Sequence, residues 1–353
     1  MLPELRIGDK TVTLPIIQGG MGVGVSRSGL AGAVAKEGGI GIISTAQIGY
    51  DEEGFEQNPA ECNLKAINKH IKKAKDIAGG NGMVGVNVMV ALKHYKEHVK
   101  EAVKAGADVI ICGAGLPVDL PELVKEETSK IAPIVSSARA SSIILKMWDH
   151  KYKRTADFLV VEGPMAGGHL GYSREQLSEL DNYNFDEEIK KIIDSKKQYE
   201  EKYNCSIPVI VGGGIFDHKD IEHVLSLGAD GVQMATRFVV TEECDADILY
   251  KQAYLNAKAE DIDIVVSPVG MPGRAVHNKF IESVENGRKA ISKCYQCLEK
   301  CNPANVPYCI TKALTDAVRG NVDEGLIFCG SNADRINSIT TVHQLMLELA
   351  GEN

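Results

Sequence analysis

Eight short apolar runs recur along the first two thirds of the chain, and most of them contain or end in glycine. They occupy residues 16–22, 39–45, 83–90, 108–115, 131–137, 158–163, 207–214 and 231–238. Their apolar character is nearly continuous instead of alternating, which is typical of parallel strands that are covered on both faces. The segments between them, such as 63–78, 94–105 and 219–227, combine helical apolar spacing with charged residues.

Eight strand–helix units in series predict an α/β fold, a closed (β/α)8 or TIM barrel over residues 1–274. A doubly wound open sheet with extra strands is the alternative that the pattern leaves open. Residues 173–204, a long charged stretch after the sixth run, fit either a lid over the barrel mouth or a solvated helical insertion. Residues 275–353 lie beyond the eighth unit, and helical patterns at 310–319 and 342–349 predict a C-terminal helical segment there.

The composition limits which kinds of binding partner and which cellular compartment we expect. The chain has 353 residues and a formal net charge of -9, which argues against nucleic acid or an anionic membrane as the main partner. No apolar run reaches the roughly 20 residues that span a bilayer, and residues 1–10 contain no apolar stretch with a cleavage site. We therefore expect a cytoplasmic protein that acts on a small-molecule substrate, with a homodimer as the expected assembly.

Glycines gather where the predicted strands end, which is where the active sites of such barrels lie. Glycine permits positive φ and lets the backbone approach a ligand closely, so glycines at four strand ends indicate a large bound ligand. These residues are Gly19, Gly20, Gly22, Gly113, Gly115, Gly163, Gly167, Gly168, Gly212, Gly213 and Gly214.

The last two strand ends predict a phosphate site. Barrel enzymes often bind phosphate between these loops, through backbone N–H groups and a helix N-terminus. The seventh run leads into a helix through the glycines at 212–214, and no Gly-x-Gly-x-x-Gly follows the first run to support a Rossmann fold. The eighth run contributes Gln233, Met234, Ala235 and Thr236.

Two polar residues in apolar surroundings are candidates for contact with the ligand. Asn87 interrupts the third run, and a buried amide there must either face a ligand or be satisfied internally. His169 follows the sixth run in the glycine-rich turn AGGHLG. A histidine in that setting can donate a hydrogen bond, stabilise developing negative charge or take a proton near neutral pH, so we assign it a catalytic role.

The segments IIQGGMG, GVNVMV, GAG, AGGHLG, GGGI and GADGVQMATRF occur in this order over about residues 10–280. Together they resemble the nitronate monooxygenase family, formerly called 2-nitropropane dioxygenases, whose fold the FMN-dependent enoyl-ACP reductases share. The resemblance implies that residues after the first strand and Asn87 hold FMN, with its phosphate at the last two strand ends. It also implies a catalytic His169 and, as a weaker transfer, a flavin- or substrate-side Lys146. The residues after the first strand are Gly19, Gly20 and Met21.

One departure from the resemblance bears on the active site. Many relatives carry Glu-Ala-Gly-Gly-His, whereas this chain has Met165 at the position of the glutamate. Any role that needs this carboxylate is therefore in doubt, and the polarity of the pocket is expected to differ.

Three functions remain open on the sequence. The first is FMN-dependent oxidation of alkyl nitronates by O2 to carbonyl compounds and nitrite. The second is an NAD(P)H-dependent flavin reductase that acts on enoyl-thioesters. The third, suggested by the missing glutamate, is a non-catalytic flavin-binding or electron-transfer protein.

The chain contains nine cysteines, and four of them fall within sixteen residues as Cys294-x2-Cys297-x3-Cys301-x7-Cys309. Tight spacing of this kind in a reducing compartment indicates a metal or redox site before it indicates disulfides. Four thiolates suit a [4Fe–4S] cluster or a tetrahedral zinc ion. The group also resembles the cysteines that follow the flavin barrel in iron–sulfur members of the old yellow enzyme family, with a shorter final spacing. Reduced cysteines in a helical tail are the alternative.

Overall fold

The computed structural model describes residues 2–125, 128–180 and 183–352, and its centre is a closed barrel of eight parallel strands. The order around the barrel is β10-β11-β3-β4-β5-β6-β7-β8. The predicted TIM barrel is confirmed, and each predicted run contains or overlaps one strand. The strands are β3 (Ile16–Gln18), β4 (Ile40–Ser44), β5 (Met83–Met89), β6 (Val109–Gly113), β7 (Lys130–Val135), β8 (Leu159–Glu162), β10 (Val209–Gly212) and β11 (Gly231–Met234).

One predicted run changes structure along its length. The strand β11 ends at Met234, and residues Thr236–Val239 of the same run form the short helix α9. The apolar residues of α9, Phe238 and Val239, are fully buried. A buried helix turn and a buried strand have the same continuous apolar pattern, so the sequence could not mark the change.

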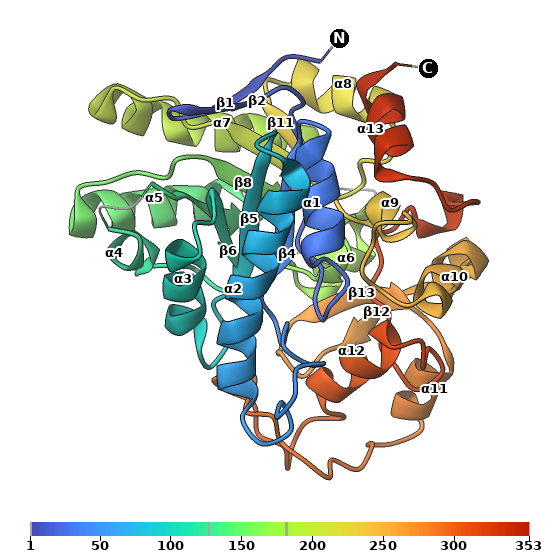
Figure 1. Cartoon of the computed structure of the whole chain (residues 1–353). Helices are drawn as coiled ribbons and strands as arrows, with labels where there is room; N and C mark the ends of the chain where they lie inside the picture. Colours follow the sequence, from blue (N-terminus) through green and yellow to red (C-terminus); the bar gives the residue numbers. More distant parts are fainter. Residues whose placement is uncertain (1, 126–127, 181–182, 353) are drawn as a thin grey trace.

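The inside of the barrel is filled by aliphatic side chains and closed at one end. Strand residues such as Ile17, Ile42 and Ile111 share one buried cluster with Leu5 and Val12. The latter two come from the antiparallel hairpin of β1 (Leu5–Ile7) and β2 (Lys10–Val12). This hairpin covers the end where the strands begin (Figure 1). The carboxyl ends of the strands are therefore left as the open end of the barrel.

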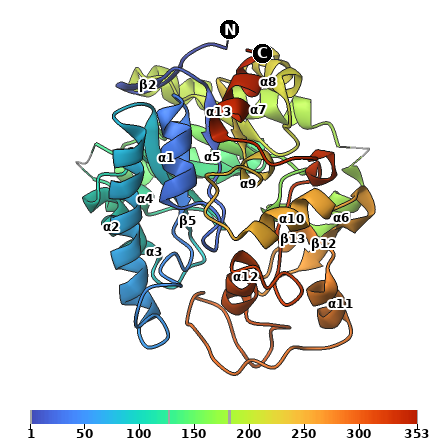
Figure 2. The same ribbon diagram turned by 45° about the vertical axis from the view of Figure 1, so that its right-hand side comes forward.

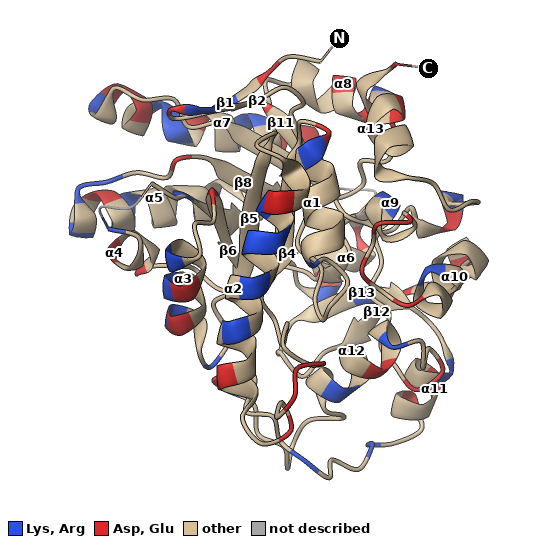
Figure 3. Cartoon of the chain, viewed as in Figure 1, with Lys and Arg blue, Asp and Glu red and all other residues tan. Residues whose placement is uncertain are grey.

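Helices surround the barrel, and they bury one apolar face each. In α2, for example, Ala66, Ile67, Ile71 and Ala74 are fully buried, whereas the outer faces carry lysine, arginine, aspartate and glutamate intermingled (Figure 3). Among the described residues no helix is both long and apolar enough to cross a membrane. The helices of this layer are α1 (Ser28–Lys36), α2 (Pro59–Ala78), α3 (Tyr95–Lys104), α4 (Leu120–Leu123), α5 (Ala138–Tyr152), α7 (Phe185–Tyr203), α8 (His218–Ser226) and α9.

The charged stretch at 173–204, with residues 181–182 outside the described chain, divides into two structures. The short helix α6 (Arg174–Ser178) comes first, and α7 follows. Because α7 packs beside α5 and buries Ile189 and Ile192, it belongs to the barrel wall. Most of the segment therefore does not lie over the barrel mouth as a cover.

The chain beyond the eighth unit returns to the open end of the barrel (Figure 2). A three-stranded antiparallel sheet joins β12 (Ile262–Val266), β13 (Pro272–Val276) and β9 (Gly168–His169), and β9 follows β8. The predicted boundary after residue 274 therefore falls inside β13. The remaining elements are α10 (Ile248–Asn256), η2 (Ala259–Asp261), α11 (Lys279–Glu285), α12 (Ile310–Val318), η3 (Ala333–Arg335) and α13 (Val342–Ala350), which packs beside α1 and α8.

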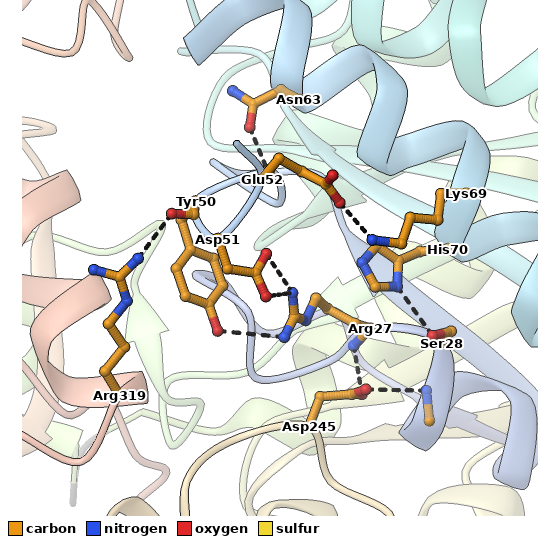
Figure 4. Close-up of polar contacts among 12 residues, drawn as sticks. Arg27, Ser28, Tyr50, Asp51, Glu52, Asn63, Lys69, His70, Asp245 and Arg319 are labelled. Carbon is orange, nitrogen blue, oxygen red and sulfur yellow. Dashed lines mark hydrogen bonds and ion pairs between the residues drawn. The ribbon is translucent and has the colours of Figure 1, made fainter. Parts of the chain in front are cut away.

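A polar cluster fixes α12 against the barrel (Figure 4). Arg319, just after α12, donates to the carbonyl oxygen of Tyr50 at 2.9 Å, and its guanidinium lies 5.2 Å from the centre of the Tyr50 ring. Arg27 lies 5.0 Å from the same ring and donates to both carboxylate oxygens of Asp51, at 2.9 and 2.7 Å. Tyr50 is thus contacted by two guanidinium groups, a favourable cation–π arrangement that ties distant segments together.

Candidate active site

A cavity of about 250 Å³ opens at the carboxyl ends of the barrel strands, and we call it the mouth cavity. Its wall contains His169 and every predicted cofactor residue except Lys146. The predicted residues that line it are Gly19, Gly20, Met21, Asn87, Gly113, Gly167, Gly168, Gly212, Gly213, Gly214, Gln233, Met234, Ala235 and Thr236.

Lys146 is the one predicted residue that the structure does not bring to the cavity. It lies exposed on α5, and the same helix buries Ile144, Leu145 and Trp148. Since the buried face of α5 points to the barrel, Lys146 projects outward from the wall. The structure therefore does not support a contact of this lysine with a flavin or a substrate.

The glycines of the cavity wall make close backbone approaches. A Cβ atom on Gly20 would lie 2.5 Å from the Cβ of Asn87, so no other residue fits there without displacing β5. Gly213 and Gly214 have φ values of +96° and +94°, which L-residues with side chains rarely adopt. These positions leave backbone, and no side chains, facing the space that a ligand would fill.

Two polar atoms of the cavity wall lack a partner within the described protein. The Oε1 atom of Gln233 and the Oγ atom of Ser331 are buried and make no hydrogen bond. Buried polar atoms are nearly always hydrogen-bonded, so each indicates a polar group of a ligand at this place. An acceptor such as Gln233 Oε1 requires a donor, and the hydroxyl of Ser331 suits an anionic oxygen.

His169, in β9, lies at the rim of the mouth cavity in a fixed orientation. Its Nε2 atom lies 2.6 Å from Ser267 Oγ, and its ring meets the ring of Phe328 edge-on, with centroids 4.9 Å apart. Burial lowers the pKa of His169 to about 4, because the charged imidazolium is poorly solvated there. The imidazole is therefore neutral at pH 7 and can accept a proton or donate a hydrogen bond.

Glu162 is a second titratable group in the cavity wall, at the end of β8. Burial raises the pKa of its carboxyl to about 7, and a hydrogen bond from the backbone N–H of Gly171, at 2.8 Å, opposes that rise. The sequence reasoning missed Glu162, although it is the last residue but one of the sixth run. Applying the strand-end rule to charged residues as well as to glycines would have found it.

Arg274, in β13, supports the loop that carries His169. Its buried guanidinium donates from Nη1 to the carbonyl oxygens of Pro164 and Ala166, at 2.9 and 2.5 Å. The backbone of Arg274 also pairs with Gly168 in the β13–β9 ladder. One residue therefore holds the turn after β8 through its side chain and the strand that positions the histidine through its backbone.

The C-terminal segment completes the cavity wall. Gly330 donates its N–H to Thr236 Oγ1 at 2.9 Å, and Asn332 Nδ2 donates to the carbonyl oxygen of Gly214 at 2.7 Å. These bonds connect the segment to both loops of the predicted phosphate site. Sequence reasoning missed this contribution, since no local pattern shows where a tail returns to a barrel.

The four clustered cysteines lie in a separate place from the mouth cavity. All four line a second cavity, which also contacts Lys93 in the loop after β5. Its volume is about 180 Å³, and we call it the cysteine cavity.

The open end of the barrel thus holds a glycine-lined cavity with unpartnered polar atoms and two perturbed titratable groups, which defines a (β/α)8-barrel enzyme that binds a polar ligand. A model of the nitronate monooxygenase family matches residues 4–352, and the chain belongs to this family. It is a flavin-dependent oxidoreductase.

Curated relatives match most of the chain, but at low sequence identity. A probable nitronate monooxygenase from Bacillus subtilis (strain 168) is 25% identical over 367 residues, with 97% of each chain covered. A protein from Mycobacterium tuberculosis (strain ATCC 25618 / H37Rv) named (3aS,4S,5R,7aS)-5-hydroxy-7a-methyl-1-oxo-octahydro-1H-indene-4-carboxyl-CoA dehydrogenase is 26% identical over 276 residues. That match covers 78% of this chain and 66% of the relative.

Solved structures show the same fold. FabK from Thermotoga maritima superposes with a TM-score of 0.71 at 24% identity, covering 96% of this chain and 92% of that chain. Nitroalkane oxidase from Streptomyces ansochromogenes superposes with a TM-score of 0.71 at 19% identity, covering 97% and 96%.

Proposed function

We propose that the mouth cavity binds FMN and that the enzyme oxidises small alkyl nitronates with O2 to carbonyl compounds and nitrite. The flavin ring would lie against Gly19, Gly20 and Asn87, where a ring N–H group would satisfy Gln233 Oε1. The phosphate would lie among Gly213, Gly214, Thr236 and Ser331, whose hydroxyl is otherwise unpartnered. Bound FMN supplies the electron-accepting centre.

The neutral His169 is the observation that carries this proposal. A nitronate is an anion, and among the described residues that line the mouth cavity none is lysine or arginine. Hydrogen-bond donors at the rim must therefore bind the nitronate. Among them, His169 is oriented by a hydrogen bond to another side chain, Ser267. A neutral imidazole in that position donates to the nitro oxygens without fixing a full positive charge against the substrate, so the product nitrite can leave.

The test uses the FMN-loaded full chain with propyl-2-nitronate in air-saturated buffer. Oxygen consumption and nitrite release should both occur, and His169→Ala should lower both at least 100-fold while retaining its flavin. Lys146→Ala, outside the cavity, is the matched control and should keep full turnover. Holoenzyme that neither consumes O2 nor releases nitrite rejects the proposed reaction.

A reductase acting on enoyl-thioesters is the second candidate, and Met165 favours it. This side chain lines the mouth cavity and is 37% exposed, which gives the rim an apolar surface suited to an acyl chain. The name of the Mycobacterium tuberculosis relative also describes a dehydrogenase of a carboxyl-CoA compound. Bleaching of the flavin within seconds of adding NADH or NADPH without oxygen would support this candidate, and a stable yellow spectrum would reject it.

A further inference from the structure

The segment between α11 and α12, residues 286–309, contains the four clustered cysteines and lies outside the flavin site. It contains no helix or strand apart from an isolated bridge between Leu298 and Leu92, and it forms the orange loop at the lower end of Figures 1 and 2. Irregular loops in compact domains rarely exceed about 12–15 residues unless they have a function. A bound group is one physical means of ordering such a loop.

The backbone holds this loop so that the thiols converge on one space. Lys93 donates its N–H to the carbonyl oxygen of Cys297 at 3.1 Å, and Glu299 donates its N–H to that of Ala91 at 3.0 Å. These bonds fix the middle of the loop to the segment after β5. The thiols of Cys294, Cys297, Cys301 and Cys309 are all free and line the cysteine cavity.

Two of the thiols already receive hydrogen bonds of the kind that stabilise a bound thiolate. Gln296 has a φ of +51° and donates its N–H to Cys294 Sγ at 3.4 Å. Cys309 accepts hydrogen bonds from the backbone N–H groups of Lys312 and Thr311, at the start of α12. A thiolate is the metal-binding form of cysteine, and N–H donors compensate its charge.

The distances between the sulfur atoms distinguish a site for an iron–sulfur cluster from a site for a single metal ion. Four thiolates at 2.3 Å from one zinc ion lie about 3.8 Å apart in a tetrahedron. Among the described residues, one group of three or more potential ligands has all its donor atoms within 4.8 Å of one another, namely Asp263, His277 and Glu285 on the surface. No three of the four cysteines are that close, and a cavity of about 180 Å³ lies between them.

We propose that Cys294, Cys297, Cys301 and Cys309 bind a [4Fe–4S] cluster in the cysteine cavity. Each thiol loses one proton and forms one bond to a different iron atom, which places the sulfurs farther apart than one ion would. Cys309 immediately precedes α12, and Leu314 of that helix lines the mouth cavity. The five-residue separation corresponds to about 7.5 Å along the helix axis. The site does not depend on which substrate the mouth cavity takes.

The test is iron and acid-labile sulfide analysis of the full chain, purified without oxygen and reconstituted with iron and sulfide. We expect about four of each per chain, with an electron paramagnetic resonance signal after dithionite reduction that persists in flavin-free protein. Cys294→Ser and Cys301→Ser should each lose most of the iron. Cys205→Ser, which removes an exposed cysteine outside the cavity, is the matched control and should retain it.

Each alternative result overturns the cluster. One equivalent of zinc without iron would show a single-ion site, and less than a tenth of an equivalent of either metal would show that the thiols bind none. Equal iron in Cys294→Ser, Cys301→Ser and the control would place the iron elsewhere. Circular dichroism melting of each variant against iron-free parent protein keeps the comparison valid, because a variant that melts with the iron-free parent has lost iron through its missing thiol and not through unfolding.

Discussion

His169 Nε2 lies 2.6 Å from Ser267 Oγ, although 98 residues separate the two in sequence. The histidine comes from β9, directly after the barrel strand β8, and the serine follows β12 in the post-barrel sheet. The strand β13 lies between β12 and β9 and pairs with both. The orientation of the proposed catalytic imidazole is therefore set by a segment outside the eight barrel units.

Removing the Ser267 hydroxyl should impair turnover without emptying the cofactor site, because Ser267 does not line the mouth cavity. We expect Ser267→Ala to lower the rate of nitrite release about 5-fold, the value of one hydrogen bond of roughly 1 kcal/mol. Flavin content should stay at the parent level. Ser267→Thr keeps a hydroxyl and should recover most of the rate, while equal rates in both variants would contradict a role in positioning His169.

A methyl group on Gly20 should block cofactor binding. The Cβ atom of Gly20→Ala would stand 2.5 Å from the Cβ of Asn87, so the backbone must move out of the wall where the flavin ring would lie. We expect at least a 10-fold weaker FMN affinity in a fluorescence titration. Gly80→Ala, at a positive φ with no atom within 4 Å of the new Cβ, controls for effects of glycine substitution elsewhere and should bind FMN normally.

The barrel could be predicted because each strand leaves its own pattern in a short stretch of sequence. Parallel strands buried on both faces leave continuous apolar runs, and closure then brings the residues that follow each strand to one end. Residues as distant in sequence as Gly19, Asn87 and Gly213 could be assigned to one site for this reason, and the structure places all three in the mouth cavity. Lys146, whose assignment came from the resemblance alone, lies outside this cavity, because Ile144 and Trp148 form the buried face of α5.

The contribution of the tail could not be predicted, since it depends on long-range contacts. Arg319 reaches Tyr50 and Asn332 reaches Gly214 across more than a hundred residues, and no periodic pattern near either arginine or asparagine signals its partner. The same holds for Ser267, which nothing in its neighbourhood connects to His169. A side chain whose role depends on a pairing such as that of β13 with β9 is visible only in the folded chain.

Glu162 should make the stability of the protein depend on pH. Its pKa is about 7 in the folded protein, against 4.5 as its ordinary value, so the folded state holds the proton more tightly than the unfolded state. The neutral carboxyl adds to the free energy of unfolding below pH 4.5, and this contribution is lost as the pH rises through 7. The total loss is about 3 kcal/mol at most. Glu162→Gln cannot ionise and should be more stable than the parent at pH 8 but equal to it at pH 4.5.

Urea unfolding of the two proteins at both pH values checks this difference. The glutamine keeps an oxygen that can accept the hydrogen bond from Gly171, so packing and hydrogen bonding are matched. A constant difference between variant and parent across this pH range would mean that Glu162 titrates normally in the folded protein.

Arg274 should be more important for the mobility of the active-site loop than for the fold of the barrel. Arg274→Met removes the donor for the carbonyl oxygens of Pro164 and Ala166, and each loses a charged partner worth about 1.5–3 kcal/mol. We expect amide exchange in residues 165–169 to accelerate at least 10-fold, while the strands β3 to β7 keep their protection. Nitrite release should fall by a similar factor because His169 lies at the end of this loop.

Arg6→Met, at an exposed position on β1 at the opposite end of the barrel, is the matched control. If exchange at residues 165–169 were the same in both variants, the loop would be held by its own turn and the support from Arg274 would be excluded.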